Sequence, residues 1–294
     1  MSASVTLARP APGAAPPADR SAFMILPPLL VLAGLFFYPL ALIATQSVTL
    51  ASGAFDPTSY LRVLGSRLFT TALAHTIEIA LAATAGCLAL GFVMSLILTF
   101  VPFPGARIVA RLIDLFIALP TFLIAVALTF VYGSAGILNM SIMQATGATQ
   151  PPFDFLYSMT GVILAEVTVY TPFIMRPLLA AFSLIETAQI EVASSLGAGA
   201  WRIVRQIILP AAQPALLAGG SLCLLLTVNE FGIVFFIGAK GVTTLPLLVY
   251  GKAIQEDDYT TACVIAIINI ALSLALYALY RTLVARASRG HGSR

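Results

Sequence analysis

Ionisable side chains inside long apolar runs are the first feature of this sequence that points to chemistry. Glu78, Glu166 and Glu230 each lie among uncharged residues, and Asn229 directly precedes Glu230. A carboxyl group in a lipid-like environment is costly, so such residues usually face a polar pathway or pair with another polar group. The alternatives are an acid-lined route for a polar solute and structural hydrogen bonds between helices.

Two of these positions favour a pathway over a structural bond. Glu166 is followed by Pro172, which frees backbone carbonyls, and transporters place solute groups at such broken helices. Asn229 and Glu230 form the second candidate, near one end of another apolar run. We therefore expect Glu166, Asn229 and Glu230 to line a translocation pathway.

The other intramembrane acids are open to a local explanation. Glu78 shares a helical face with His75, so a pathway role and a local polar pair stay equally open. Asp114 lies three residues from Arg111, which favours a local ion pair between these two side chains.

No set of residues indicates an enzyme. The chain contains no G-x-x-x-x-G-K-[ST] phosphate loop, and its only histidines are His75 and His291. The three cysteines, Cys87, Cys223 and Cys263, lie in apolar runs without metal-ligand spacing, which is typical of packing thiols. We expect no catalytic residue, no bound metal and no cofactor.

The composition defines the elements that must position these side chains. Of 294 residues, 60% are hydrophobic and 9% are charged, against about 25% charged residues in soluble domains. The mean hydropathy is +1.00. The sequence therefore predicts an all-α membrane protein that crosses the lipid bilayer several times. The net charge of +3 is too small to indicate nucleic acid as a partner.

Six apolar stretches are long enough to cross a hydrocarbon core of about 30 Å. Pro172 and Pro177 are expected to interrupt the fourth of them. The flanking segments are an Ala/Pro-rich tail at 1–20, predicted to be disordered, and a basic tail at 286–294. The predicted spans cover residues 22–45, 71–100, 112–132, 159–182, 215–237 and 259–283.

The distribution of Lys and Arg predicts the orientation. With the N-terminus in the cytoplasm, one side holds Arg9, Arg20, Arg107, Arg111, Arg176, Arg202, Arg205, Arg281, Arg286, Arg289 and Arg294. The other side holds only Arg62, Arg67, Lys240 and Lys252. This bias predicts that both termini and the segment between the fourth and fifth spans are cytoplasmic.

That segment, 186–210, is too polar to be a span. Apolar residues recur in it at helical spacing on both sides of Gly197-Ala198-Gly199, which predicts two short amphipathic helices joined by a bend. Pro210 and Pro214 are expected to restrict continuation of the second helix.

The same segment resembles the EAA signature of bacterial ABC importer permeases. Glu191-Val192-Ala193, three residues, Gly197, nine residues and then Ile207-Ile208-Leu209-Pro210 match the family pattern, except that Val192 replaces the usual Ala. The resemblance implies the six-span MetI-like fold of type I importers, in the inner membrane of a bacterial cell. It also implies that ATP is hydrolysed by a separate subunit.

In that family the EAA unit is a coupling helix that docks into the ATPase. By resemblance, the coupling residues here are Glu191, Ala193, Gly197, Ala198, Trp201, Arg205, Leu209 and Pro210. The implied partners are an ABC ATPase dimer, a periplasmic substrate-binding protein and a second permease subunit. One coupling unit per chain requires two chains for two ATPases, as a homodimer or a heterodimer.

The run at 229–254 looks like the branch of the family that imports polyamines, ferric iron, sulfate and phosphonates. It is most similar to permeases for 2-aminoethylphosphonate, with the other cargoes as alternatives. His75-Thr76-Ile77 departs from the Asn-Thr-Leu common in relatives. An ion-coupled secondary transporter, an intramembrane enzyme and a membrane scaffold are the alternatives from other classes.

Overall fold

The computed structural model describes residues 21–49 and 53–289; the side chains of 21–24 and 284–289 are not described. Two units are distinguished, residues 1–45 and 46–294. Within the first, helix α1 (Ser21–Gln46) is exposed along almost its whole length and contains Pro27, Pro28 and Pro39. The predicted tail at 1–20 lies outside the described residues.

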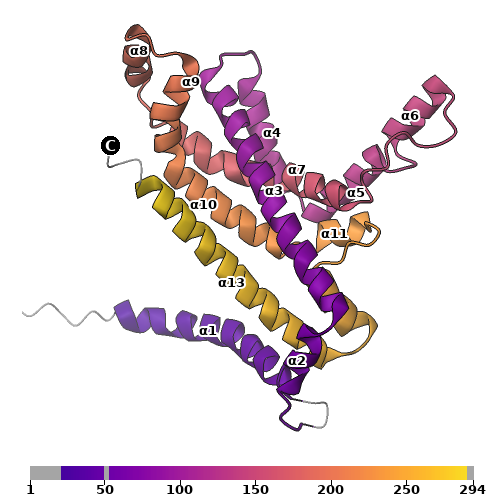
Figure 1. Cartoon of the computed structure of the whole chain (residues 1–294). Coiled ribbons are helices and arrows are strands. Elements are labelled where there is room, and N and C mark those ends of the chain that lie inside the picture. Colours follow the sequence, from indigo (N-terminus) through magenta and orange to yellow (C-terminus); the bar gives the residue numbers. More distant parts are fainter. Residues whose placement is uncertain (1–20, 50–52, 290–294) are drawn as a thin grey trace, which may run out of the picture. The chain divides into compact units, whose positions relative to one another are not determined.

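Three helices form the centre of the second unit. They are α3 (Arg67–Phe100), α7 (Met159–Phe182) and α10 (Leu209–Val228), and each packs against the other two (Figure 1). Small residues permit the close approach: a Cβ on Gly91 of α3 would come within 2.9 Å of Ile174 on α7. In lipid, such van der Waals packing replaces the hydrophobic effect as the force that associates helices.

The remaining helices surround this core. α13 (Tyr259–Arg289) packs on α10 and on α12 (Leu245–Tyr250), α5 (Thr121–Tyr132) packs on α11 (Gly232–Ile237), and α4 (Ala106–Ala118) lies on α7. The shorter elements are α2 (Thr58–Leu64), α6 (Ile137–Thr146), α8 (Thr187–Ser195), α9 (Ala200–Ile203), η1 (Val204–Ile208) and η2 (Gly251–Gln255).

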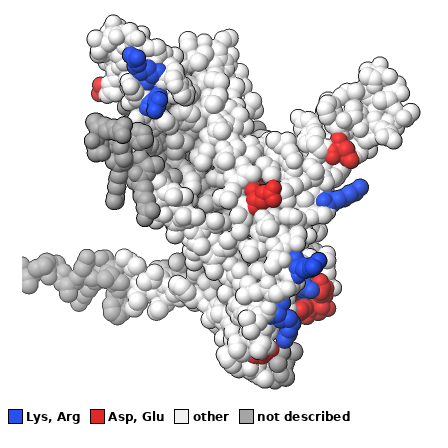
Figure 2. All heavy atoms as spheres, viewed as in Figure 1, with Lys and Arg blue, Asp and Glu red and all other residues white. Residues whose placement is uncertain are grey.

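Six helical segments of the described chain are long and apolar enough to cross a membrane. They are Ile25–Gln46, Arg67–Phe100, Thr121–Thr146, Met159–Phe182, Ala200–Val228 and Tyr259–Leu283. Most of the surface seen in Figure 2 is neither Lys or Arg nor Asp or Glu, as expected for a surface that faces lipid.

The third span differs from the predicted range 112–132. α4 ends at Ala118, and α5 starts only after Pro120. Proline disfavours the helical conformation of the residue before it, and Leu119 is extended with φ −80° and ψ 137°. One apolar run therefore becomes two helices, and the apolar helical segment begins at Thr121.

In α7 and α10, by contrast, prolines do not interrupt the helix. α7 runs without interruption from Met159 to Phe182 although it contains Pro172 and Pro177, so the expected interruption is absent. α10 likewise continues through Pro210 and Pro214. Before Pro210 the chain widens into the π-helical turn η1, where the N–H of Leu209 donates to the carbonyl of Val204, five residues back. This wider turn makes room for the proline ring.

The fifth span also shifts, whereas the sixth, Tyr259–Leu283, has the predicted bounds. The apolar helical segment runs from Ala200 to Val228 rather than over 215–237, because the chain breaks at Asn229 and resumes as α11 at Gly232. α13 extends to Arg289, so the predicted tail at 286–294 begins as helix, and residues 290–294 lie outside the described part of the chain.

Candidate functional site

The segment between α7 and α10 contains two short helices, and the first of them ends in a glycine cap. α8 stops at Ser195, and Gly197 has φ +81°, a left-handed conformation that glycine adopts without steric cost. The N–H of Gly197 donates to the carbonyl of Ser194 at 2.9 Å, and the N–H of Ala198 donates to that of Ala193 at 3.0 Å. This is a Schellman motif with glycine at its C′ position.

This turn explains the spacing within the sequence motif. Ala193 and Gly197 both supply backbone groups to one cap, and Glu191 lies two residues before Ala193 on α8. α9 restarts at Ala200, directly after Gly199. The predicted bend is therefore present, and we call residues 186–203 the coupling turn.

The coupling turn leaves apolar side chains without cover. Neither α8 nor α9 buries any residue, and the side chains of Leu196 and Trp201 are 81% and 75% exposed. Among the described residues, Glu191 and Arg205 are exposed and form no ion pair. An apolar patch with charged side chains at its edge is typical of a protein–protein docking surface.

Further along, Leu209 is 36% exposed and Pro210 is also exposed, while Ile208 is buried. These two residues begin α10 and connect the coupling turn to the core helices without an intervening loop. A displacement of the turn would therefore reach α10 directly.

Glu230 is held by hydrogen bonds within the subunit. It is 7% exposed; Oε2 accepts a hydrogen bond from the hydroxyl of Tyr170 on α7, and Oε1 accepts one from the N–H of Ile233 at 2.7 Å. Ile233 lies in the first turn of α11, whose N–H groups have no helical partner. Glu230 thus supplies the acceptor that the broken backbone needs inside a membrane.

Glu166 is enclosed but has no partner. Its side chain is fully buried, and neither carboxyl oxygen makes a hydrogen bond to a described residue. It lies one helical turn before Tyr170 on α7, the tyrosine that donates to Glu230 from the break between α10 and α11. The sequence pattern identified both acids but not this connection.

Asn229 is exposed and is fixed by contacts with α13. Its amide bonds to Asn269 at 3.0 Å and to Ser273 at 3.2 Å. Neither partner was among the predicted site residues. Two polar side chains four residues apart in the sixth apolar run were the signal that would have indicated them.

Glu78 lies on the surface of α3 and makes no hydrogen bond or ion pair to the described residues. Nδ1 of His75 instead lies 3.2 Å from both the N–H and the carbonyl oxygen of Thr243. The local pair of Glu78 with His75 is therefore absent. The hydroxyl of Thr76 accepts a hydrogen bond from the N–H of Leu245, which places α12 against α3.

The expected pair of Asp114 with Arg111 is wrong. Asp114 on α4 instead accepts hydrogen bonds from Nη2 and Nε of Arg176 on α7, at 2.7 and 2.9 Å. Both side chains are more than half exposed. Sequence spacing identifies partners only within a helix, and this partner is 62 residues away.

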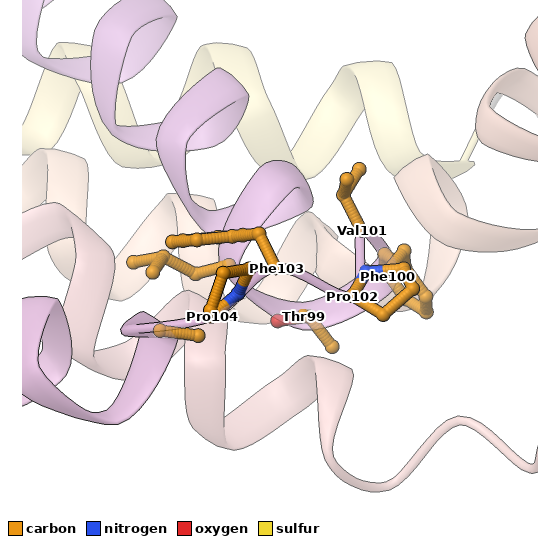
Figure 3. A pocket seen from close by; sticks show the side chains of 8 residues that line it. Thr99, Phe100, Val101, Pro102, Phe103 and Pro104 are labelled. Atoms are coloured by element: carbon orange, nitrogen blue, oxygen red, sulfur yellow. The ribbon is translucent and has the colours of Figure 1, made fainter.

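Two cavities lack charged side chains, whereas one of about 220 Å³ beside α2 is lined in part by Arg62, Lys252 and Asp258. One of about 640 Å³ lies at the turn between α3 and α4 and is lined by Leu98–Pro104 and Ala106, with no charged side chain (Figure 3). Another of about 290 Å³ lies between α3, α4 and α7 and is almost entirely apolar. Within the described residues no group of three or more His, Cys, Asp or Glu side chains is placed to hold a metal.

The fold is that of the membrane subunits of ABC importers. The crystal structure of a bacterial ABC transporter involved in the import of the acidic polysaccharide alginate has a TM-score of 0.75, at 16% identity over 91% of this chain and 96% of that chain. The inward-facing methionine transporter MetNI has a TM-score of 0.54 at 19% identity, over 81% of this chain and 99% of that chain.

The family model described as binding-protein-dependent transport system inner membrane component matches residues 88–289. The chain belongs to this family and is a multi-pass protein of the inner membrane. Membership favours an ABC importer permease over the ion-coupled transporter and the scaffold.

A Salmonella typhimurium relative, provisionally named 2-aminoethylphosphonate transport system permease protein PhnU, is 59% identical over 267 residues, 91% of this chain and 93% of that protein. The sulfate transport system permease protein CysT of the same organism is 32% identical over 206 residues, 68% of this chain and 70% of that protein.

Proposed function

We propose that this chain is the permease subunit of an importer for 2-aminoethylphosphonate. The 59% identity to PhnU over nearly the full length of both chains is the observation that supports this choice of solute. Sulfate is the second candidate, supported by CysT, but at 32% identity over about two thirds of the chain. Polyamines and ferric iron have no comparable support.

The energy for transport comes from a separate ABC ATPase dimer that docks on the coupling turn. The exposed apolar patch around Leu196 and Trp201 supports this docking, because it is otherwise uncovered. In this proposal both termini and the coupling turn are cytoplasmic, and a periplasmic binding protein delivers the solute to the opposite side. Two permease subunits, identical or different, serve the two ATPases.

The four candidate pathway residues contribute to this proposal unequally. Glu78 and Asn229 reach the surface of the subunit, where a pathway between two permeases would run. Glu166 and Glu230 are enclosed, so they would meet a solute only after α7 and α10 move apart. Glu78→Gln and Asn229→Ala are therefore expected to reduce uptake more than Glu166→Gln.

The deciding experiment is reconstitution of the chain with the ATPase and binding protein expected from its own operon. Hydrolysis of ATP should be stimulated by the binding protein loaded with 2-aminoethylphosphonate, and the labelled solute should accumulate in the vesicles. Stimulation by a sulfate-loaded binding protein would instead favour the second candidate. Absence of stimulation by any binding protein would refute the proposal.

A further inference from the structure

Three polar side chains join α10 to α13 beside the helix break. Nδ2 of Asn229 donates to the backbone oxygen of Leu225 at 2.8 Å and to Oγ of Ser273 at 3.2 Å. Oδ1 of Asn229 accepts from Nδ2 of Asn269 at 3.0 Å. The hydroxyl of Ser273 donates to the backbone oxygen of Asn269 at 2.9 Å. We call Asn229, Asn269 and Ser273 the amide cluster.

The contacts determine which amide atom lies where. A backbone carbonyl only accepts hydrogen bonds, so the atom of Asn229 that faces Leu225 must be the nitrogen. Oδ1 therefore faces Asn269, which must present its own nitrogen. Oδ1 of Asn269 is left buried and accepts no hydrogen bond from the described residues, and Asn269 as a whole is only 8% exposed.

The hydrogen-bonding groups that remain unused in the cluster are mostly acceptors. Both N–H groups of Asn229 and the hydroxyl hydrogen of Ser273 are already used. Asn229 Oδ1 keeps one lone pair and Asn269 Oδ1 keeps both, against one N–H of Asn269. No described Lys or Arg side chain bonds to the cluster. Such a group of oxygens suits a hydrogen-bond donor with positive charge.

The cluster also lies near the middle of the sixth apolar segment. Asn269 is ten residues into α13, about 15 Å along a helix and about half of a 30 Å hydrocarbon core. Asn229 is exposed at the surface, and Asn269 lies behind it. The neighbouring Glu230 turns the other way, toward α7 and α11.

We propose that Asn229 and Asn269 form a subsite for the primary ammonium group of the solute. Their two amide oxygens accept two of its three N–H groups. A phosphonate group would need donors, of which the cluster keeps only one N–H of Asn269, so the subsite favours the ammonium end of a zwitterion. The ammonium group meets Asn229 first, and the Asn229 side chain turns to admit it to Asn269. This inference rests on the proposed function, in which the solute carries an ammonium group.

The test uses the full chain assembled with its ATPase and partner permease in nanodiscs, without binding protein. Calorimetry measures binding of ethylammonium chloride, ethylphosphonate and sodium chloride, in the nucleotide-free and the vanadate-trapped states. Ethylammonium is expected to bind in at least one state, and ethylphosphonate is not. Asn229→Ala and Asn269→Leu are expected to weaken ethylammonium binding by about tenfold or more, the range of a lost hydrogen bond to a charged group.

Two further variants keep the test decisive. Ser273→Ala removes a supporting hydroxyl but no amide oxygen, so it should change ethylammonium binding by less than about threefold. Asn269→Ser replaces Asn269→Leu if the leucine variant fails to assemble. Binding of sodium without ethylammonium, undiminished binding in the variants, or no binding of ethylammonium in either state would overturn the subsite.

The same nanodiscs separate this inference from the function on which it rests. If binding protein loaded with 2-aminoethylphosphonate stimulates ATP hydrolysis but ethylammonium does not bind, only the subsite is wrong. If no binding protein stimulates hydrolysis, the proposed function itself is wrong.

Discussion

The coupling turn and the break after α10 both interrupt a helix, and the backbone hydrogen bonds that the helix loses are replaced differently in the two places. In the coupling turn, backbone groups are satisfied locally by the glycine cap, while Leu196 and Trp201 stay exposed. At the break after Val228, Glu230 and Tyr170 satisfy the backbone from inside the subunit. In the coupling turn the backbone hydrogen bonds are formed but apolar side chains stay exposed. At the break, Glu230 bonds to the backbone and is itself buried.

In the proposed function, this difference separates a surface that an ATPase covers from a region that is closed within the subunit. Exposed apolar side chains gain free energy when a partner covers them. A buried carboxylate with both oxygens bonded gains nothing from a partner and is costly to disturb. Changes in the coupling turn should therefore affect assembly and transport, whereas loss of the bonds that hold Glu230 should mainly affect the stability of the subunit.

The largest effect is expected from a side chain at Gly197. Gly197→Val places a β-branched residue at φ +81°, which costs roughly 1–3 kcal/mol locally and favours a different turn. Uptake by the reconstituted transporter should fall by about tenfold or more, while the amount of inserted permease stays unchanged.

Gly199→Val is the matched control for this change. Gly199 has φ −69° and ψ 161°, which any residue adopts, and a Cβ at either glycine would have no neighbour within 4 Å. The two variants differ only in backbone conformation. Equal uptake by both would show that the glycine cap is irrelevant to coupling.

Trp201→Ala tests whether the exposed surface is a docking surface. Aromatic side chains dominate many interfaces, so its loss should weaken binding of the ATPase by about tenfold or more. The unfolding temperature of the isolated permease should not change, because Trp201 is 75% exposed. Phe130→Ala on α5, 69% exposed and far along the chain, is the control and should leave ATPase binding intact. If Trp201→Ala lowered the unfolding temperature and left ATPase binding unchanged, the exposed surface would serve the fold of the subunit and not docking.

Tyr170→Phe tests the enclosed region. It removes the hydroxyl that donates to Glu230 and leaves a buried carboxylate oxygen without a partner, at a cost of about 1–3 kcal/mol. The unfolding temperature in detergent should fall, and ATPase binding by the folded fraction should stay the same. Tyr277→Phe on α13 is the control, because among the described residues the hydroxyl of Tyr277 bonds only to the exposed Arg281. An unchanged unfolding temperature would mean that the break does not depend on this bond.

The two regions also differ in how far the sequence predicted them. The coupling turn was predicted with its bend, since a glycine cap depends on residues within a few positions of each other. The break after Val228 was missed, because the acceptor for α11 is supported by Tyr170, sixty residues away. Asp114 pairs with Arg176 rather than Arg111 for the same reason.

Apolar length predicted six spans but not their breaks. The long runs around α3, α7 and α13 were identified closely. Proline was a poor guide in both directions: Pro120 divides a run that was predicted to be continuous, and Pro172 does not divide α7. Whether a helix tolerates proline depends on neighbours that can accommodate the ring and satisfy the freed carbonyl.

The smallest effect is expected at Asp56, whose carboxylate also accepts a hydrogen bond from a backbone N–H near a helix start. Its side chain is partly buried, with 15% exposed. Asp56 Oδ1 accepts hydrogen bonds from the hydroxyl and the N–H of Thr58 at the start of α2, and these bonds lower the pKa of Asp56 below its ordinary value. A lowered pKa means that the carboxylate contributes stability above about pH 4, and that this contribution is lost as the pH falls through the folded-state pKa.

Asp56→Asn should therefore lower the unfolding temperature slightly at pH 7, by less than Tyr170→Phe, and the difference from the unmodified chain should shrink at pH 3. Asp257→Asn is the control, since the carboxyl of Asp257 has no hydrogen bond to a described residue. Both Asp56 and Glu230 bond to backbone N–H groups at a helix start. Glu230 is buried and bonded to Tyr170, whereas Asp56 is partly buried and lies 3.7 Å from the guanidinium of Arg62. A larger loss from Asp56→Asn than from Tyr170→Phe would show that enclosure adds nothing to such a bond.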